Sequence, residues 1–346
     1  MSRIKNCSGC MGVVLIAVMA MVFAGCSEDS PTGPGLDTVP SKAVYIINGL
    51  AETLSVFDIE QETMTNDVLT VGKWPNAIAV RGDRAYAVNS GDHTVQVIDL
   101  DAMESVGTID LGAGANPMQI AFLSDQKAYV TNNLTNTVAV VDLGAMIVTK
   151  TIAVGMTPTS VVVSEGKVYV GNTAFQWPSY GEGTVSVIST ETDEVVGTIP
   201  VGINPQFAGV DASGRVHVVC TGDYAEVEGA VYVIDPSSDT VSAMVLVGGA
   251  PGAIAITPDG RAYLTSASGL LAYETSDGSV VHSGSEPMTA YAGASGITVG
   301  STGRLYVCVP DWTSQGLDKL MVVDGISEEL LGTYTPGGGA QCAAVR

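Results

Sequence analysis

A tyrosine recurs at nearly constant intervals along most of this chain of 346 residues. Six tyrosines mark the copies, and a histidine takes the fifth of seven places: Tyr45, Tyr86, Tyr129, Tyr169, His217, Tyr263 and Tyr306. The repeats around them begin at residues 43, 84, 127, 167, 215, 261 and 304, with spacings of 40 to 48 residues. Such a period is typical of architectures in which each copy of a small unit buries its apolar surface against the next copy.

Each repeat reads as short β-strands separated by turns. Val168–Val170 and Val185–Ile188 are β-branched runs of strand length. A strand of small apolar residues precedes each tyrosine strand, as in residues 77–80 and 253–256, and dipeptides such as Glu165-Gly166 favour a hairpin between the two. Long helical patterns are absent from the sequence. We therefore predict an all-β fold, a seven-bladed β-propeller with four antiparallel strands per blade.

The two ends of the repeat region predict how such a ring closes. The region begins with a tyrosine strand at residue 43 and stops at Arg346, just after a strand of the small apolar kind. Residues 341–346 therefore have no tyrosine strand of their own to pair with. We expect them to pair with the first blade from its inner side, because this pairing removes the open edges of the sheets.

Several columns of residues support a family resemblance over residues 43–346. Tyr129-Val130-Thr131-Asn132 spells one motif in full, and the chain resembles the YVTN-repeat β-propellers. An asparagine three residues after the tyrosine, an acidic residue that ends the next strand, and a Gly-x-x-Pro turn also recur. The members are Asn48, Asn89, Asn132 and Asn172; Asp58, Asp99, Asp142, Asp235, Glu274 and Asp324; and turns beginning at Gly72, Gly114, Gly155, Gly202 and Gly248. We expect the acidic column to accept hydrogen bonds from backbone N–H groups in the adjacent turns.

Residues 1–25 have the pattern of a secretory signal peptide, with Arg3 and Lys5 before an apolar run from Met11 to Ala24. The residues up to Cys26 resemble the lipobox of bacterial lipoproteins, with Phe23 where that motif usually has leucine. The resemblance implies cleavage before Cys26, its lipidation, and export to the outer membrane on the periplasmic or cell-surface side. Ordinary secretion with Cys26 as a free thiol is the alternative. Residues 26–42 are rich in Pro, Gly and Ser and read as a lipidated flexible tether to the propeller at 43–346.

The net charge limits the partners that the chain can bind, and the cysteine content limits its disulfides. Removing residues 1–25 takes away Arg3 and Lys5 and changes the formal net charge from −22 to −24. Such a surface repels nucleic acid, so we expect no nucleic-acid partner, and we expect a monomer. Cys220, Cys308 and Cys342 remain in the repeats. They are expected to be buried thiols, with a Cys308–Cys342 disulfide near the seam of the ring as the alternative.

Three connections that follow tyrosine strands are long: Thr173–Gly183, Thr221–Gly229 and Pro310–Lys319. In a propeller they share one face with the Gly-x-x-Pro turns, and exposed aromatic residues there are typical binding anchors. The predicted ligand-binding residues are Trp74, Trp177, Tyr180, Tyr224, Glu226, Glu228, Asp311 and Trp312. The alternative is that the aromatic residues cap the ends of blades.

Charges are expected to differ between the two faces. The face of the long loops carries Glu52, Asp92, Glu182, Asp223, Glu226, Glu228, Glu286, Asp311 and Asp318, and the opposite face collects Lys42, Arg81, Arg84, Lys127, Lys167, Arg215, Arg261 and Arg304. We predict one acidic and one mainly basic side. Asp223, Glu226 and Glu228 could bind Ca²⁺ together with backbone carbonyls. A solvated acidic loop is the alternative, and no other cofactor is predicted.

Two functions follow from these patterns. The first is a binding or scaffold module that recognises a protein, peptide or glycan through the loop face. The alternative is a propeller enzyme, either lactonase-like or an oxidoreductase with a bound cofactor. Such sites need clustered histidines, cysteines or charges, whereas His93, His217 and His282 fall in separate repeats. Because His217 replaces a core tyrosine, we expect it to be packed and hydrogen-bonded.

Overall fold

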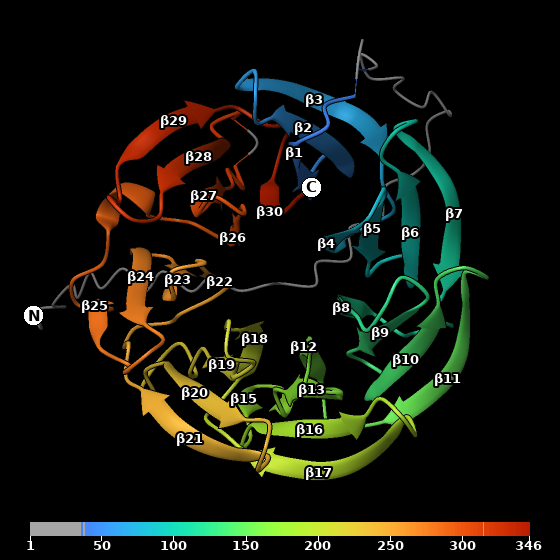
Figure 1. Cartoon of the computed structure of the whole chain (residues 1–346), viewed down its shortest axis with the longest axis vertical. Coiled ribbons are helices and arrows are strands. Elements are labelled where there is room, and N and C mark those ends of the chain that lie inside the picture. The colour runs from blue at the N-terminus through green and yellow to red at the C-terminus, as the bar shows by residue number, and fades with distance from the viewer. Residues whose placement is uncertain (1–35, 37–38, 314) are drawn as a thin grey trace, which may run out of the picture. The chain divides into compact units, whose positions relative to one another are not determined.

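The computed structural model describes residue 36, residues 39–313 and residues 315–346. These residues form seven four-stranded antiparallel sheets, the blades, arranged around a central axis (Figure 1). The inner strand of each blade lies beside the inner strands of the two neighbouring blades, and the series returns to its starting point. The predicted seven-bladed β-propeller is therefore confirmed.

The strands of the first four blades run from the inner to the outer edge as follows. Blade 1 contains β30 (Ala340–Val345), β1 (Ala43–Asn48), β2 (Thr53–Asp58) and β3 (Thr63–Thr70). Blade 2 contains β4 (Pro75–Arg81), β5 (Arg84–Asn89), β6 (Thr94–Asp99) and β7 (Glu104–Asp110). Blade 3 contains β8 (Pro117–Phe122), β9 (Lys127–Asn132), β10 (Thr137–Asp142) and β11 (Ile147–Ala153). Blade 4 contains β12 (Pro158–Ser164), β13 (Lys167–Asn172), β16 (Thr184–Ser189) and β17 (Glu194–Pro200).

The other three blades follow the same order. Blade 5 contains β18 (Pro205–Val210), β19 (Val216–Cys220), β20 (Ala230–Asp235) and β21 (Thr240–Val245). Blade 6 contains β22 (Ile254–Ile256), β23 (Arg261–Ser266), β24 (Gly269–Glu274) and β25 (Val280–His282). Blade 7 contains β26 (Gly296–Val299), β27 (Arg304–Val309), β28 (Lys319–Asp324) and β29 (Leu330–Tyr334). Two short strands, β14 (Phe175–Gln176) and β15 (Ser179–Tyr180), form a separate hairpin, and a 3-10 helix, η1 (Thr289–Tyr291), precedes blade 7.

The second and third strands of the blades form the core. In β5 and β6, for example, the four central residues of each strand are buried, whereas most of β7 is exposed. Neighbouring blades cover both faces of the middle strands, which is why these strands lack the polar alternation of a half-exposed sheet. The recurring tyrosines, with His217 in blade 5, all lie buried in second strands. No helix of the described residues is long and apolar enough to cross a membrane.

The C-terminal strand closes the ring as predicted. β30 pairs with β1 in antiparallel register, with Tyr45 opposite Ala344. The carboxylate of Asp318, which is only 2% exposed, accepts hydrogen bonds from the backbone N–H groups of Gly339 and Ala340 at the start of β30. Blade 1 is thus built from both ends of the repeat region.

The propeller has two faces. The loop face holds the connections from second to third strands and from each outer strand to the next inner strand. The hairpin face holds the hairpins between inner and second strands and the turns between third and outer strands. On the hairpin face, Asp58, Asp99 and Asp324 each accept backbone N–H groups two and three residues ahead. The predicted role of the acidic column as a turn cap is confirmed at these positions.

Candidate functional site

Polar side chains on the hairpin face join neighbouring blades in a repeated arrangement that we call the clasp. In the clasp, a basic residue and a tyrosine of a second strand meet an acidic residue in the turn between the third and outer strands of the next blade. Lys127 Nζ lies 2.8 Å from an oxygen of Asp193, and the Tyr129 hydroxyl donates to Asp193 at 2.6 Å. The same contacts join Lys167 and Tyr169 to Asp239, and Arg261 and Tyr263 to Glu328.

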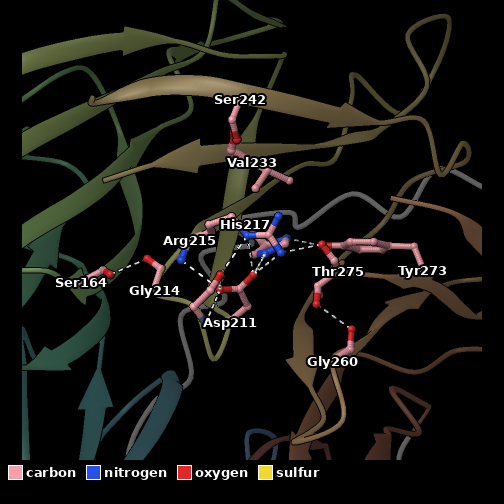
Figure 2. Close-up of polar contacts among 11 residues, drawn as sticks. Ser164, Asp211, Gly214, Arg215, His217, Val233, Ser242, Gly260, Tyr273 and Thr275 are labelled. Atoms are coloured by element: carbon pink, nitrogen blue, oxygen red, sulfur yellow. Dashed lines mark hydrogen bonds and ion pairs between the residues drawn. The ribbon is translucent and has the colours of Figure 1, made fainter. Parts of the chain in front are cut away.

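The junction between blades 5 and 6 replaces this clasp with a buried relay (Figure 2). His217 Nε2 lies 3.1 Å from Oδ2 of Asp211, and His217 Nδ1 lies 2.7 Å from the hydroxyl of Tyr273 in β24 of the next blade. Arg215 donates to Asp211 and to the backbone carbonyl of Thr275. The bonds to Tyr273 and Thr275 join blade 5 to blade 6, and those to Asp211 lie within blade 5. The predicted packed and hydrogen-bonded histidine is thus confirmed.

The protonation states follow from burial and hydrogen bonding. Burial lowers the pKa of His217 and outweighs the attraction of Asp211, so the imidazole is neutral. Burial alone would raise the pKa of Asp211, but hydrogen bonds from Ser213, His217 and Arg215 hold it well below its usual range. A neutral imidazole that donates from Nε2 to Asp211 and accepts at Nδ1 from Tyr273 satisfies every partner. Because all three side chains are buried, the relay offers no access to a substrate.

The loop face brings several aromatic residues together over blades 4 and 5. We call Phe175, Trp177, Tyr180 and Tyr224 the aromatic patch. The ring centroids of Phe175 and Tyr180 are 4.8 Å apart, those of Tyr180 and Tyr224 are 6.4 Å apart, and those of Phe175 and Trp177 are 6.5 Å apart. These separations lie in the range of favourable aromatic pairs. The long loops of two adjacent blades thus form one surface.

Local structure positions this patch. Phe175 and Tyr180 face each other across the β14–β15 hairpin, and Trp177 stands at its tip, 74% exposed. Tyr224 projects from the loop of blade 5 with 57% exposure, and its hydroxyl accepts a hydrogen bond from Gln206 on the inner strand β18. Large exposed aromatic rings on loops that a hairpin and a hydrogen bond hold in place are suited to binding a partner rather than to packing within the protein.

Two of the predicted aromatic residues lie elsewhere on this face. Trp74 is in the turn before β4 and is 65% exposed, and Trp312 is in the loop of blade 7 and is 55% exposed. Trp74 has a positive φ of 50°, and Asn116, Thr157 and Asn204 have φ values of 50° to 61° at the same place in their turns. This conformation is therefore a property of the repeat and marks no special strain at Trp74.

The predicted acidic residues shape their own loops. The Asp223 carboxylate accepts the backbone N–H groups of Ala225, Glu226 and Val227. Asp311 accepts the hydroxyl of Thr313 and the backbone N–H groups of Thr313, Gln315 and Leu317, and these bonds lower its pKa to about 2. Glu226 and Glu228 follow Tyr224 of the aromatic patch in the sequence. The Glu228 carboxylate lies near Gly248. Within the described ranges, no three His, Cys, Asp or Glu residues lie close enough together to hold a metal ion.

The expectation of a mainly basic hairpin face is wrong. Seven of its eight named basic residues form ion pairs with acidic residues, often on a neighbouring blade, and Arg84 is the exception. The repeat positions of the basic residues predicted the face on which they lie, but they did not reveal the acidic residues with which they pair. Asp318, expected among the surface acids, is instead buried beneath the closing strand.

Cysteines and histidines form no redox or metal centre in the part of the chain that the structure describes. Cys220, Cys308 and Cys342 are free thiols there, and burial raises the pKa of Cys342 to about 12. His93 accepts the backbone N–H of Asn116, and His282 pairs with Glu328 at 2.8 Å. Both histidines are already hydrogen-bonded, and no three metal-ligating side chains of the described residues lie together, so these groups do not fit the ligand set of a haem or a copper ion. Cys26, the predicted lipidation site, lies outside the described residues.

Two residues of this site were missed from the sequence. Phe175 stands in one of the long loops beside Trp177 and Tyr180, which are the more typical binding anchors. Gln206 directly follows the proline of a Gly-x-x-Pro turn, and that position could have placed it on the loop face. Its contact with Tyr224 is visible only in three dimensions.

No known family profile and no curated protein sequence matches the chain. Among solved structures, it is similar to the hydrazine synthase of Kuenenia stuttgartiensis, with 18% identity and a TM-score of 0.65 over 78% of this chain and 89% of that chain. It is also similar to a quinoprotein alcohol dehydrogenase-like protein of Bacteroides thetaiotaomicron, with 15% identity and a TM-score of 0.62 over 86% and 76%. At these identities the similarity shows the propeller fold alone.

Proposed function

We propose that this protein is an exported, lipid-anchored binding or scaffold propeller of the YVTN-repeat type. In this proposal Cys26 carries the lipid at the bacterial outer membrane, residues 27–42 form the tether, and the propeller acts as a monomer. The motif at Tyr129–Asn132 and the lipobox-like residues before Cys26 support this assignment. Its formal charge of −24 after signal removal argues against a nucleic-acid partner.

The aromatic patch is the observation that carries the proposed activity. Trp177 and Tyr224 expose large rings on two adjacent loops, and the β14–β15 hairpin and Gln206 hold these loops in place. Rigid aromatic anchors of this kind bind flat or extended partners at low entropic cost. We therefore infer that the patch recognises a protein, a peptide or a glycan, with Glu226 and Glu228 giving its rim a negative charge. The acidic loop is proposed as a solvated rim rather than a calcium site.

Replacement of Trp177 and Tyr224 by alanine tests this function. The wild-type chain is first screened against a glycan array and a displayed peptide library, and the double variant is compared on every hit. Loss of two anchors should weaken binding by at least about 100-fold, since each typically contributes about 2 kcal/mol. Trp312→Ala is the matched control, because it removes another exposed tryptophan from the same face, outside the aromatic patch. Unchanged binding in the double variant would contradict the proposal.

The alternative is a propeller enzyme of the lactonase-like or cofactor-bearing type. One structural neighbour is a quinoprotein alcohol dehydrogenase-like protein, and this similarity supports the alternative. Elemental analysis and an absorbance spectrum of the purified protein separate the two functions. Stoichiometric copper or a bound chromophore would favour the enzyme and count against the binding module.

A further inference from the structure

The junction between blades 2 and 3 lacks the acidic member of the clasp. Arg84 and Tyr86 occupy the basic and tyrosine positions in β5, but the turn position that is Asp193 or Asp239 in later blades is Met146. No described carboxylate forms an ion pair with Arg84, whereas the basic residues at the equivalent positions of blades 3, 4 and 6 are all paired. One junction of the ring thus presents the donors of a clasp without its acceptor.

Met146 has the backbone of a clasp residue but not its side-chain direction. Its φ of 56° matches the 55° of Asp193 and the 53° of Asp239, so the three residues hold the same place in the turn. The Met146 thioether instead lies against Gly107 in β7. An aspartate at this position would need no backbone change to reach the second strand of blade 2.

A groove lies beside Arg84 and Tyr86 at this junction. It has a volume of about 350 Å³ and is lined by Arg81, Asp83, Arg84, Tyr86, Asp125 and Gln126, with the turn at Leu143 and Gly144. An equivalent groove lies between blades 4 and 5 beside Lys167. There Asp239 bonds both Lys167 at 2.6 Å and Tyr169 at 2.8 Å. The two junctions differ in the turn residue before the outer strand, which supplies a carboxylate to the basic and tyrosine side chains at Asp239 and none at Met146.

The acidic residues near Arg84 are already engaged. Asp83 pairs with Arg346 at 2.8 Å, and Asp125 pairs with Arg81 at 2.7 Å. Asp99, which lies opposite Arg84 in the neighbouring strand, accepts the backbone N–H groups of its own turn, and these bonds together with the charge of Arg84 lower its pKa. The guanidinium of Arg84 is therefore the cation available to an incoming anion. Burial raises the pKa of Tyr86, so its hydroxyl is protonated and can donate beside the guanidinium.

We propose that the groove between blades 2 and 3 binds a carboxylate group in the position that Asp193 and Asp239 take in the clasps of later blades. Arg84 pairs with the carboxylate through its planar fork of N–H donors, and Tyr86 donates a further hydrogen bond. The volume admits a small organic acid or the terminal residue of a peptide. Both sources share the carboxylate, which is the group that the site recognises.

The charge balance favours a carboxylate over a phosphate. One unpaired guanidinium neutralises one negative charge, and Asp83 and Asp125 lie on the walls of the same groove. A dianion would meet these two carboxylates and the negative field of the whole chain. The site is separate from the aromatic patch, which is on the loop face.

Titration with N-acetylglycine tests the proposal on the folded protein. The resonance of the Arg84 Nε–H group, assigned by comparison with Arg84→Gln, should shift and saturate. N-acetylglycinamide, which has the same shape without the charge, should give no shift. Absence of a saturable shift with N-acetylglycine at any concentration up to 50-fold above the protein's, repeated in chloride-free buffer, would overturn the proposal.

Two substitutions at one position provide the matched comparison. Met146→Asp should supply the missing acid and weaken N-acetylglycine binding by at least ten-fold, whereas Met146→Leu should leave binding unchanged. Arg84→Gln should also weaken it by at least ten-fold, which keeps the test available if Met146→Asp does not fold. Equal binding by wild type and Arg84→Gln would overturn the assignment.

Two further titrations distinguish the sources of the carboxylate. Acetate and a pentapeptide with a free C-terminus are compared with the C-terminally amidated peptide. Saturation by the free peptide at lower concentration than by acetate assigns the groove to a peptide terminus. The reverse order assigns it to a small acid. Equal binding of the free and amidated peptides would contradict carboxylate recognition altogether.

Discussion

At the scale of single residues, the recurring tyrosine acts as a cross-blade connector as well as a core side chain. Its ring packs between its own blade and the next, and in blades 3, 4 and 6 its hydroxyl reaches an acidic residue of the next blade. Burial and this carboxylate raise the pKa of Tyr129 and Tyr169 above the usual range, so both hydroxyls remain donors. A phenylalanine would fill the same space without this bond, which accounts for the choice of tyrosine.

Because His217 is buried, we predict that the folded protein loses stability in mild acid. The ordinary pKa of this histidine is about 6.5 and burial lowers it in the folded chain, so protonation favours unfolding. Its stabilising contribution is therefore complete above pH 6.5 and is lost as the pH falls toward the folded pKa. The free energy of unfolding should fall by up to about 1.4 kcal/mol per pH unit below 6.5 from this group.

Urea unfolding at pH 7.5 and 5.5 measures this effect. His217→Gln keeps hydrogen-bonding capacity but does not titrate, so its stability should change less over this interval than that of wild type. Asp211 does not contribute there, because its depressed pKa makes its own loss begin only below pH ~4. Equal pH dependence of the two proteins would show that His217 is not the titrating group.

At the scale of strands and turns, the asparagine column and the Gly-x-x-Pro column of the repeat contact each other. The Asn172 amide donates to Thr184 and Ser186, and its side chain lies directly over Gly155 of the Gly-x-x-Pro turn. A Cβ added at Gly155 would stand 2.6 Å from Asn172. In blade 5, where Cys220 takes the asparagine position, the cysteine instead lies over Gly202. The glycine is needed because a buried side chain occupies the space beside it.

Gly155→Ala should therefore destabilise the protein by about 1–3 kcal/mol, the usual cost of overpacking. Gly338→Ala is the matched control, since it has no heavy atom within 4 Å of the added Cβ. That variant should be neutral or slightly more stable, because alanine reduces the entropy of the unfolded chain. Thermal unfolding of both variants is the measurement, and equal melting temperatures would contradict this contact.

Strand order and blade number could be predicted because the repeat columns mark them directly. Tyr129 and its equivalents recur at regular intervals in the sequence, and each marks the second strand of a blade. The clasps could not be predicted, because Lys127 and Asp193 are 66 residues apart and belong to different repeats. The aromatic patch was predicted in part, because Trp177, Tyr180 and Tyr224 lie in the long loops that the sequence reveals. The β14–β15 hairpin was not predicted, since it is an insertion that no repeat column describes.

At the scale of the whole molecule, ring closure unites the two ends of the repeat region. Arg346 extends this closure, because its guanidinium pairs with Asp83 and Asp101 of blade 2. The Gln341 side chain also donates to the carbonyl of Pro75. Blade 1 is thereby tied to blade 2 through the last residues of the chain. The loop face, the clasps and the open groove all depend on the blade-to-blade geometry that this closure maintains.

Thermal unfolding of a chain that ends at Ala340 is the most direct test of this account. It removes most of β30, leaves β1 with an open edge and exposes the core beneath Ala344. We predict a fall in melting temperature of about 10 °C or more, while removal of Arg346 alone should shift it by about 2 °C or less. A chain ending at Ala340 that melts cooperatively at the wild-type temperature would contradict closure of the ring by its C-terminal strand.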